Sequence, residues 1–397
     1  MSDSREVLLD IVRAYWPIPL CSFLVSLVST ALCRRFALRH DIVDRPDHFL
    51  KPHKQPIPYL GGVAVYLGWA AGIVLALIMF DRVTEIPDMP RPGPSMHVVM
   101  MIGILVAVTV IMLLGLYDDL RTVSPKVKLG VQIALAGWLM AIGVGDDTIV
   151  VLLQVKLEFG PWLLLAYSIP LTLLITVGAS NATNLIDGMD GLCSGVLGII
   201  SVGFLVIAVH LHLWSDWHPW DVQRVVLSLA LLGASFGFLP FNRSPAKIFM
   251  GDAGSMVLGL NAAILLLLFA KSGGGALRWF WGAAMVFGLP FADMALTLVR
   301  RWRSERPVME GDRSHYYDQL VDRGLPVRRV VRISYMLAAC FAGLGCLVIW
   351  LRTRYIVIVY FLAVMAVAVV VKRLRLVRAE RAPNDRHEKP RSTGGKS

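Results

Sequence analysis

Carboxylates and amides gather in four short polar segments that interrupt an otherwise apolar sequence. These segments lie at residues 117–120, 181–191, 251–255 and 312–315. Polar side chains are costly at a membrane, so their presence between apolar segments indicates function. Acidic clusters that converge on one face are typical of a site for a divalent cation and a phosphorylated substrate.

The first segment carries two adjacent carboxylates, Asp118 and Asp119, at the end of an apolar run. Successive residues on a helix point about 100° apart, because about 3.6 residues make one turn. We therefore expect the two carboxylates to face different partners, one a metal ion and the other a substrate. The alternative is a solvated pair at a helix end.

Three polar residues of the second segment, Asn184, Asp187 and Asp190, are spaced three apart. On a helix this spacing gives one polar stripe. Such amides and carboxylates match the donor groups of a sugar, ribose or base, or coordinate Mg²⁺. Gly188 and Gly191 would let the backbone approach a ligand closely or break the helix. The alternative is a helix cap followed by a loop.

The last two segments add a carboxylate and a histidine. Asp252 has two possible roles. It either caps the helix that follows it, or its carboxylate binds a cation that bridges to an anion held at the N-terminus of that helix. Asn242, ten residues earlier, is a candidate phosphate or metal contact. His315 follows Arg306 and Arg313, and this basic loop fits a pyrophosphate substrate.

The elements that must position these residues are membrane helices. The chain of 397 residues is 56% hydrophobic and 17% charged, whereas about a quarter of a soluble protein is charged. Apolar runs of about 20 residues recur along it, which predicts an all-α polytopic membrane protein. The net charge of +11 is then explained by membrane topology, and nucleic acid is not an expected partner. The cysteines predict neither a disulfide framework nor a zinc site.

We predict eleven transmembrane helices, with the N-terminus outside and the C-terminus cytoplasmic. The expected spans are 15–34, 59–80, 96–116, 127–144, 161–179, 193–212, 223–239, 254–270, 279–299, 331–350 and 355–371. In this orientation the inside segments hold 29 of the 39 lysines and arginines, as the positive-inside rule requires. All four polar segments then face the cytoplasm, as does the basic loop that contains His53. Residues 1–375 would form the membrane domain, and 376–397 a basic disordered tail attracted to anionic lipid.

Four motifs extend these polar segments. They read His53-x-x-Pro-x-Pro-x-x-Gly-Gly62, Asp118-Asp119 followed by Ser124-Pro-Lys-Val-Lys128-Leu, Asn181-x-x-Asn-x-x-Asp-Gly-x-Asp-Gly-Leu192, and Lys247-Ile-Phe-Met-Gly-Asp-x-Gly-Ser255. In this order they resemble the polyprenyl-phosphate N-acetylhexosamine-1-phosphate transferases, a membrane superfamily that includes the enzymes that start O-antigen and teichoic acid assembly and phospho-MurNAc-pentapeptide transferase. The resemblance covers roughly residues 15–370, and eleven spans favour its N-acetylglucosamine-1-phosphate branch.

The resemblance implies an enzyme of the inner (plasma) membrane with a cytoplasmic active site. It would transfer N-acetylhexosamine-1-phosphate, with N-acetylglucosamine the expected sugar, from a UDP-sugar to undecaprenyl phosphate and release UMP. Mg²⁺, with Mn²⁺ as an alternative, is the implied cofactor. The implied pathway is the first membrane step of cell-surface polysaccharide assembly, such as the O-antigen of lipopolysaccharide. Related enzymes form dimers, so a homodimer is also an expectation.

The resemblance also implies a role for each matched residue. Asp252 would be the main Mg²⁺ ligand, Asp118 would act on the attacking lipid phosphate, and Asp119 would help at the metal or phosphate. Asn184 and Asp187 would bind the nucleoside-diphosphate end of the donor, and Asp190 would make a further substrate contact. Asn242 would contact a phosphate, and His315 the pyrophosphate. Lys128 and His53 would contact the lipid phosphate.

One departure concerns the late loop, which in this family usually carries several histidines. Here only His315 matches, while Tyr317 and Asp318 stand where further histidines would be. This departure disfavours the peptidoglycan substrate and leaves the sugar open.

Two other functions compete with this interpretation. A secondary transporter should carry its polar residues near the middle of the spans, whereas here they lie at span ends. A CDP-alcohol phosphotransferase has four aspartates in one continuous stretch followed by an arginine, and residues 187–191 lack that spacing. The remaining alternative is a scaffold in which the acids only cap helices.

Overall fold

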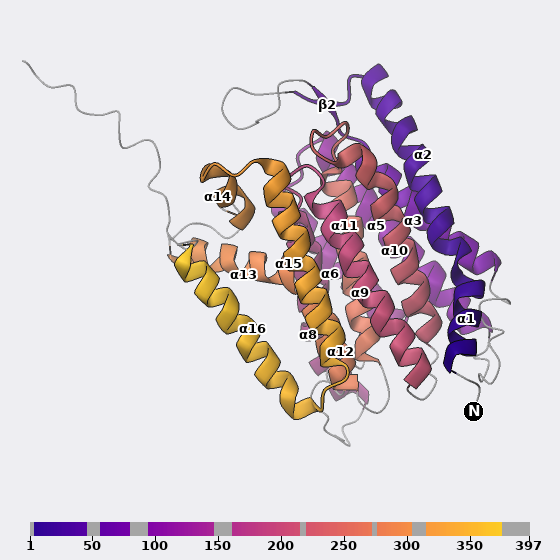
Figure 1. Ribbon diagram of the computed structural model, residues 1–397. Coiled ribbons are helices and arrows are strands. Elements are labelled where there is room, and N and C mark those ends of the chain that lie inside the picture. The colour runs from indigo at the N-terminus through magenta and orange to yellow at the C-terminus, as the bar shows by residue number, and fades with distance from the viewer. Residues whose placement is uncertain are drawn as a thin grey trace, which may run out of the picture.

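The computed structural model describes most of the chain as a bundle of long helices (Figure 1). The described residues are 4–45, 56–79, 94–146, 161–214, 220–271, 276–303 and 315–374. His53, Arg306, the segment 312–314 and the expected tail over 376–397 lie outside them.

An apolar environment offers the backbone no partner but itself, so each apolar run forms a helix. The helices are α1 (Ser4–Tyr15), α2 (Pro17–Arg39), α3 (Gly61–Ile78), α5 (Pro94–Leu120), α6 (Pro125–Ala141), α8 (Pro161–Leu185), α9 (Leu192–Trp214), α10 (Asp221–Asn242), α11 (Gly251–Ala270), α12 (Ala276–Val286), α13 (Gly288–Arg303), α14 (Tyr316–Asp322), α15 (Val327–Val348) and α16 (Thr353–Arg373).

The helices confirm a polytopic helical membrane protein. Each of the eleven expected segments falls on a helix or, for 279–299, on the pair α12 and α13. Among the described residues, eight helices are long and apolar enough to cross a membrane, or nine when α12 and α13 count as one bent span. These two helices meet at a bend of 70°, and α13 runs across the direction of the bundle (Figure 1).

The centre of the bundle is α11, whose most apolar stretch is 100% buried. It packs against α8, α5, α3 and α12. The helix α16 lies at the periphery, with only 6% of its apolar stretch buried. Because the polar N-terminus of α11 begins at Gly251, the most central helix presents its first turn at one end of the bundle.

Two small elements depart from the sequence-based expectation. The helix α1 precedes the first expected span, and its Ile11 and Tyr15 are buried. A two-residue antiparallel pairing joins β1 (Val43–Asp44) to β2 (Ile57–Pro58), so the fold is not strictly all-α. The second strand lies beside the segment that precedes α11, because Phe249 N donates to Pro58 O at 2.9 Å.

Candidate active site

The site is built around the last turn of α5, where Asp118 and Asp119 turn to different partners. Asp118 Oδ1 accepts a hydrogen bond from Val123 N at 2.6 Å, while its Oδ2 lies 2.5 Å from Lys128 Nζ. Asp119 instead faces the start of α11. The predicted divergence of the pair is therefore confirmed, with about 100° of rotation per residue as its cause.

Asp119 caps the N-terminus of α11 from a different helix. Its Oδ1 accepts from Asp252 N at 2.8 Å and its Oδ2 from Ala253 N at 3.1 Å. The first N–H groups of a helix have no partner within the helix, and its positive end favours a carboxylate. The alternative that Asp252 is the N-cap is wrong, because Met250 holds that position and makes no side-chain cap.

This cap requires a glycine at the first residue of α11. Gly251 has φ +68°, a left-handed conformation that side chains disfavour. A Cβ atom at this position would lie 2.5 Å from Asp119 Oδ2. Gly251 therefore lets the carboxylate of Asp119 reach the backbone, and the position of Asp252 depends on both residues.

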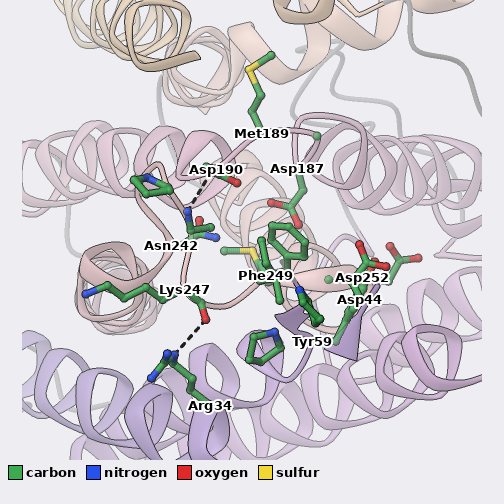
Figure 2. A pocket seen from close by; sticks show the side chains of 18 of the residues that line it. Arg34, Asp44, Tyr59, Asp187, Met189, Asp190, Asn242, Lys247, Phe249 and Asp252 are labelled. Atoms are coloured by element: carbon green, nitrogen blue, oxygen red, sulfur yellow. Dashed lines mark hydrogen bonds between the residues drawn. The ribbon is translucent and has the colours of Figure 1, made fainter. Parts of the chain in front are cut away.

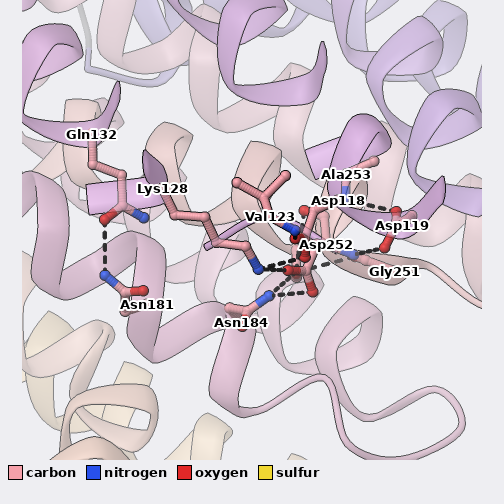
Figure 3. Close-up of polar contacts among 11 residues, drawn as sticks. Asp118, Asp119, Val123, Lys128, Gln132, Asn181, Asn184, Gly251, Asp252 and Ala253 are labelled. Carbon is pink, nitrogen blue, oxygen red and sulfur yellow. Dashed lines mark hydrogen bonds and ion pairs between the residues drawn. The ribbon is translucent and has the colours of Figure 1, made fainter. Parts of the chain in front are cut away.

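A single cation joins the two remaining carboxylates of the cluster (Figure 3). Lys128, in the first turn of α6, places its Nζ 2.5 Å from Oδ2 of both Asp118 and Asp252. On the other side, Asn184 Nδ2 donates to Asp252 Oδ1 at 2.8 Å and to Ser255 Oγ at 3.0 Å. With Asp119 included, the structure thus brings together five of the predicted site residues, from α5, α6, α8 and α11.

The donor set fits a divalent cation that is shared with a substrate. Asp118 and Asp252 converge on one positive charge, that of Lys128. Within the described part of the chain, no three acidic, histidine or cysteine side chains form a group that could hold a metal ion alone. Mg²⁺ is usually held by one or two carboxylates with substrate phosphates and water completing its shell, and two converging carboxylates match that mode.

The segment after α8 is a loop and not the polar helical stripe expected for Asn184, Asp187 and Asp190. The helix ends at Leu185, so only Asn184 lies on it. Asp187 is half-buried, and its side chain has no hydrogen-bond or ion-pair partner among the described residues. Burial, followed by the charges of Asp252, Asp119 and Asp190, raises the pKa of Asp187 well above its usual range. An unpartnered carboxylate in this position is available to a ligand.

Two other predicted residues join this loop to the segment before α11. Asp190 Oδ2 accepts a hydrogen bond from Ala246 N at 3.0 Å. Asn242 is buried and bonded through both ends of its amide. Its Oδ1 accepts from Gly191 N at 3.0 Å, and its Nδ2 donates to Ile248 O at 3.1 Å. These bonds hold two walls of one cavity at a fixed separation.

That cavity has a volume of about 830 Å³ and lies beside the acidic cluster (Figure 2). Asn184, Asp187 and Asp252 line its polar side. Tyr59 and Phe249 also line the cavity, and their rings lie 6.1 Å apart edge to face. Pockets that combine apolar and aromatic walls with a few placed polar groups are typical of small-molecule sites.

Sequence reasoning missed the apolar walls of the cavity. Tyr59 follows β2, and Phe249 is held between Pro58 and Gly61 by two backbone hydrogen bonds. Both lie inside the motifs already noted, but an aromatic residue in an apolar chain carries no signal of its own. Their positions depend on the pairing of distant backbone segments.

His315 lies next to this assembly and outside the lining of the cavity. Its Nδ1 lies 2.8 Å from Asp293 Oδ2 on α13, and its ring stacks on Tyr317 at a centroid distance of 5.1 Å. Tyr317 in turn donates its hydroxyl hydrogen to Leu185 O at 2.7 Å. The histidine is therefore linked to the end of α8 through a tyrosine.

Comparison with known proteins agrees with this arrangement. The chain matches glycosyl transferase family 4 over residues 101–270. It is 31% identical over 375 residues to a probable undecaprenyl-phosphate N-acetylglucosaminyl 1-phosphate transferase of Bacillus subtilis, covering 92% of this chain and 93% of that protein. It is 32% identical to a decaprenyl-phosphate N-acetylglucosaminephosphotransferase of Mycolicibacterium smegmatis, and the match covers 93% of this chain and 90% of that protein. An undecaprenyl-phosphate alpha-N-acetylglucosaminyl 1-phosphate transferase of Yersinia pestis is 28% identical, with 81% of each chain covered.

Proposed function

Because the chain belongs to glycosyl transferase family 4, we propose that it transfers N-acetylglucosamine-1-phosphate from UDP-N-acetylglucosamine to a polyprenyl phosphate and releases UMP. The observation that carries this proposal is the cluster of Asp118, Lys128 and Asp252 at the edge of the cavity. Relatives named for this reaction match nearly the whole chain. We take undecaprenyl phosphate as the acceptor, and cell-surface polysaccharide assembly as the pathway that the product enters.

The reaction needs a site at a membrane surface, since one substrate is soluble and the other is a long isoprenoid. We propose eleven crossings, with the active site on the cytoplasmic side of the plasma membrane. The distribution of 29 of 39 basic residues supports this orientation. The contacts among α5, α6, α8 and α11 support a single shared end for the chemistry.

The cavity is suited to the nucleotide sugar. Tyr59 and Phe249 offer aromatic surface to the base or sugar, and the carboxylate of Asp187 accepts hydrogen bonds from hydroxyl or N–H groups. Asp190 and Asn242 would act by fixing the walls, because their side chains already bond the backbone. Contacts of His53 with the lipid phosphate and of His315 with the pyrophosphate stay predictions.

In the chemical step, an oxygen of the lipid phosphate attacks the β-phosphorus of the UDP-sugar. The bond from this phosphorus to the oxygen that bridges it to the α-phosphorus breaks, and UMP leaves. The second pKa of a phosphate monoester is about 6, so the nucleophile is largely ionised at neutral pH and no strong base is required. Asp118 and Lys128 would orient the acceptor phosphate, while Asp119 keeps Asp252 in place. Positioning and charge stabilisation are the main contributions of protein groups in phosphoryl transfer.

Asp252 and Asp118 are the residues that would hold Mg²⁺, with the diphosphate of the donor completing its shell. The bound ion would neutralise charge that develops on the phosphoryl oxygens. Lys128 reaches the same carboxylate oxygens, so its ammonium group and the metal would compete for them. Lys128, placed between these two carboxylates, would donate to a substrate phosphate.

The test is UMP release by the purified full-length protein supplied with undecaprenyl phosphate, Mg²⁺ and a panel of UDP-N-acetylhexosamines. Turnover that needs lipid, responds to chelation by EDTA and prefers UDP-N-acetylglucosamine supports the proposal. UMP release without lipid would contradict transfer to a polyprenyl acceptor. A preference for another UDP-sugar would retain the reaction and correct the donor.

A further inference from the structure

A second cavity lies beside the first, and its wall is basic instead of acidic. It has a volume of about 760 Å³ and lies between the end of α10, the loop before α11 and the first turns of α15. Four cationic side chains line it, namely Arg243, Lys247, Arg328 and Arg332. The carboxylate in this wall, Asp190, already accepts a hydrogen bond from Ala246 N.

The cations of this basic cavity carry uncompensated charge. Arg328 Nε donates to Ser244 O at 3.1 Å, and Arg332 Nε donates to Arg328 O at 3.4 Å. Both acceptors are neutral backbone carbonyls. Across the described residues, none of the four cations has a carboxylate within ion-pair distance. The wall therefore holds four positive charges and one negative charge, that of Asp190, and an anion would stabilise the excess positive charge.

The position of the cavity favours a lipid over a soluble anion. The helix α10 ends at Asn242 and α15 begins at Val327, and both are apolar enough to cross a membrane. The two helices lie on either side of α9 (Figure 1). A cavity at the ends of neighbouring spans lies at the level of phospholipid headgroups, where basic pockets between helices bind anionic lipid.

We propose that the basic cavity binds the phosphate of an anionic membrane phospholipid. Arginine is suited to this role, because its planar guanidinium donates paired hydrogen bonds to phosphate oxygens. The cavity shares Asp190, Pro245 and Lys247 with the substrate cavity. The segment that separates the two cavities leads into Asp252, so a bound headgroup would hold the loop that carries one wall of the substrate site.

The experiment titrates the purified full-length protein in neutral detergent with dioctanoyl phosphatidylglycerol. Dioctanoyl phosphatidylcholine serves as the neutral lipid and inorganic phosphate as the free anion, and binding is followed by calorimetry. We expect phosphatidylglycerol to bind more tightly than either. We take about 1 kcal/mol for each arginine that lines the cavity, which is about a fivefold change in affinity, so Arg328→Gln with Arg332→Gln should weaken binding about 25-fold.

The matched control is Arg329→Gln, which removes the same charge from the same turn of α15 but does not line the cavity. It should change affinity less than twofold. Arg243→Gln is a second test, because no α15 hydrogen bond is lost with it, and it should weaken binding about fivefold. Equal binding of both lipids, or equal losses in Arg329→Gln and the cavity variants, would overturn the site. Tight binding of inorganic phosphate, with no preference for phosphatidylglycerol, would overturn the assignment of a lipid as the ligand.

Discussion

Charged side chains meet at both ends of the bundle, but their arrangements differ. At the active end, one lysine serves two carboxylates, and the exposed fractions are 25% for Lys128, 13% for Asp118 and 25% for Asp252. At the opposite end, Asp221 and Arg224 are fully buried and pair with each other. One arrangement is shared and open to a ligand, and the other is closed.

The opposite end is closed because its charges also reach the backbone of a neighbouring helix. Arg224 donates from Nε at 3.1 Å and from Nη2 at 2.6 Å to Leu268 O near the end of α11. Lys271 pairs with Asp146 at 2.6 Å. These contacts fix α10 and the end of α11 in place. The comparison indicates that buried polar groups in this protein support structure when they are matched, and chemistry when they converge and leave a charge unmatched.

The largest predicted effect is a loss of activity, without a loss of stability, from a change at the active end of the bundle. Asp252→Asn should lower kcat about 10³-fold, because it removes a carboxylate that would hold the charge of the reacting phosphates. The variant should unfold at nearly the same temperature as the parent protein. UMP release and thermal unfolding in detergent measure the two quantities. Activity within tenfold of the parent would remove Asp252 from the proposed chemistry.

The second prediction concerns stability at the opposite end. Arg224→Met should lower the free energy of unfolding by about 3–5 kcal/mol, because it removes the positive charge that pairs with the buried carboxylate of Asp221. The variant protein that remains folded should catalyse the reaction with a kcat close to that of the parent protein. Combining it with Asp221→Asn should restore part of the lost stability. Denaturant titration in mixed micelles gives the free energy, and a loss of kcat without a loss of stability would contradict the structural role.

The third prediction tests the link between the cap of α11 and the chemistry. Gly251→Ala should lower kcat about 100-fold, because small misplacements at a reacting centre have effects of this size. The new Cβ would meet the carboxylate of Asp119 in a strained backbone conformation. Gly130→Ala is the control, since a Cβ at Gly130 meets nothing within 4 Å. Equal activity of both variants would show that the first turn of α11 tolerates displacement.

The sequence was sufficient to predict where the helices form and which residues belong to the acidic cluster. Apolar runs and the helical period predicted where helices form, and the polar breaks predicted which residues meet. The number of crossings was harder to predict, because α6 and α8 match two expected spans but are not among the described helices that are long and apolar enough to cross a membrane. The break after Leu185 was given only as the alternative, because three polar residues at helical spacing favour a stripe on a continuous helix.

The roles of individual residues within the site could be assigned only from their contacts in the three-dimensional structure. Asp119 was expected at the metal or phosphate, whereas the structure describes it at the backbone of α11. Asn242 was expected at a phosphate, and its amide is bonded to two loops. The bonds of Asp119 and the bond from Gly191 N to Asn242 join segments more than 50 residues apart, so no local pattern encodes them. The contribution of Tyr317 was invisible for the same reason.

The smallest predicted effect distinguishes two adjacent tyrosines of α14. Burial raises the pKa of Tyr317 well above its usual range, so its phenol stays protonated and donates to Leu185 O at the end of α8. Tyr316 makes a comparable bond to Ser334 Oγ at 2.8 Å, on α15. Either change to phenylalanine should reduce stability by about 1 kcal/mol, the usual net value of one hydrogen bond.

Only Tyr317→Phe should also affect substrate binding. The hydroxyl group of Tyr317 lies against Gly188 with no room for a Cβ atom between them, so Tyr317 supports the loop that carries Asp187. Loss of this support should raise KM for the UDP-sugar about fivefold, the equivalent of about 1 kcal/mol, with little change in kcat. Tyr316→Phe should leave KM unchanged. Equal KM values for the two variants would assign both tyrosines to stability alone, whereas the predicted split would extend the active end of the molecule from the acidic cluster to α14.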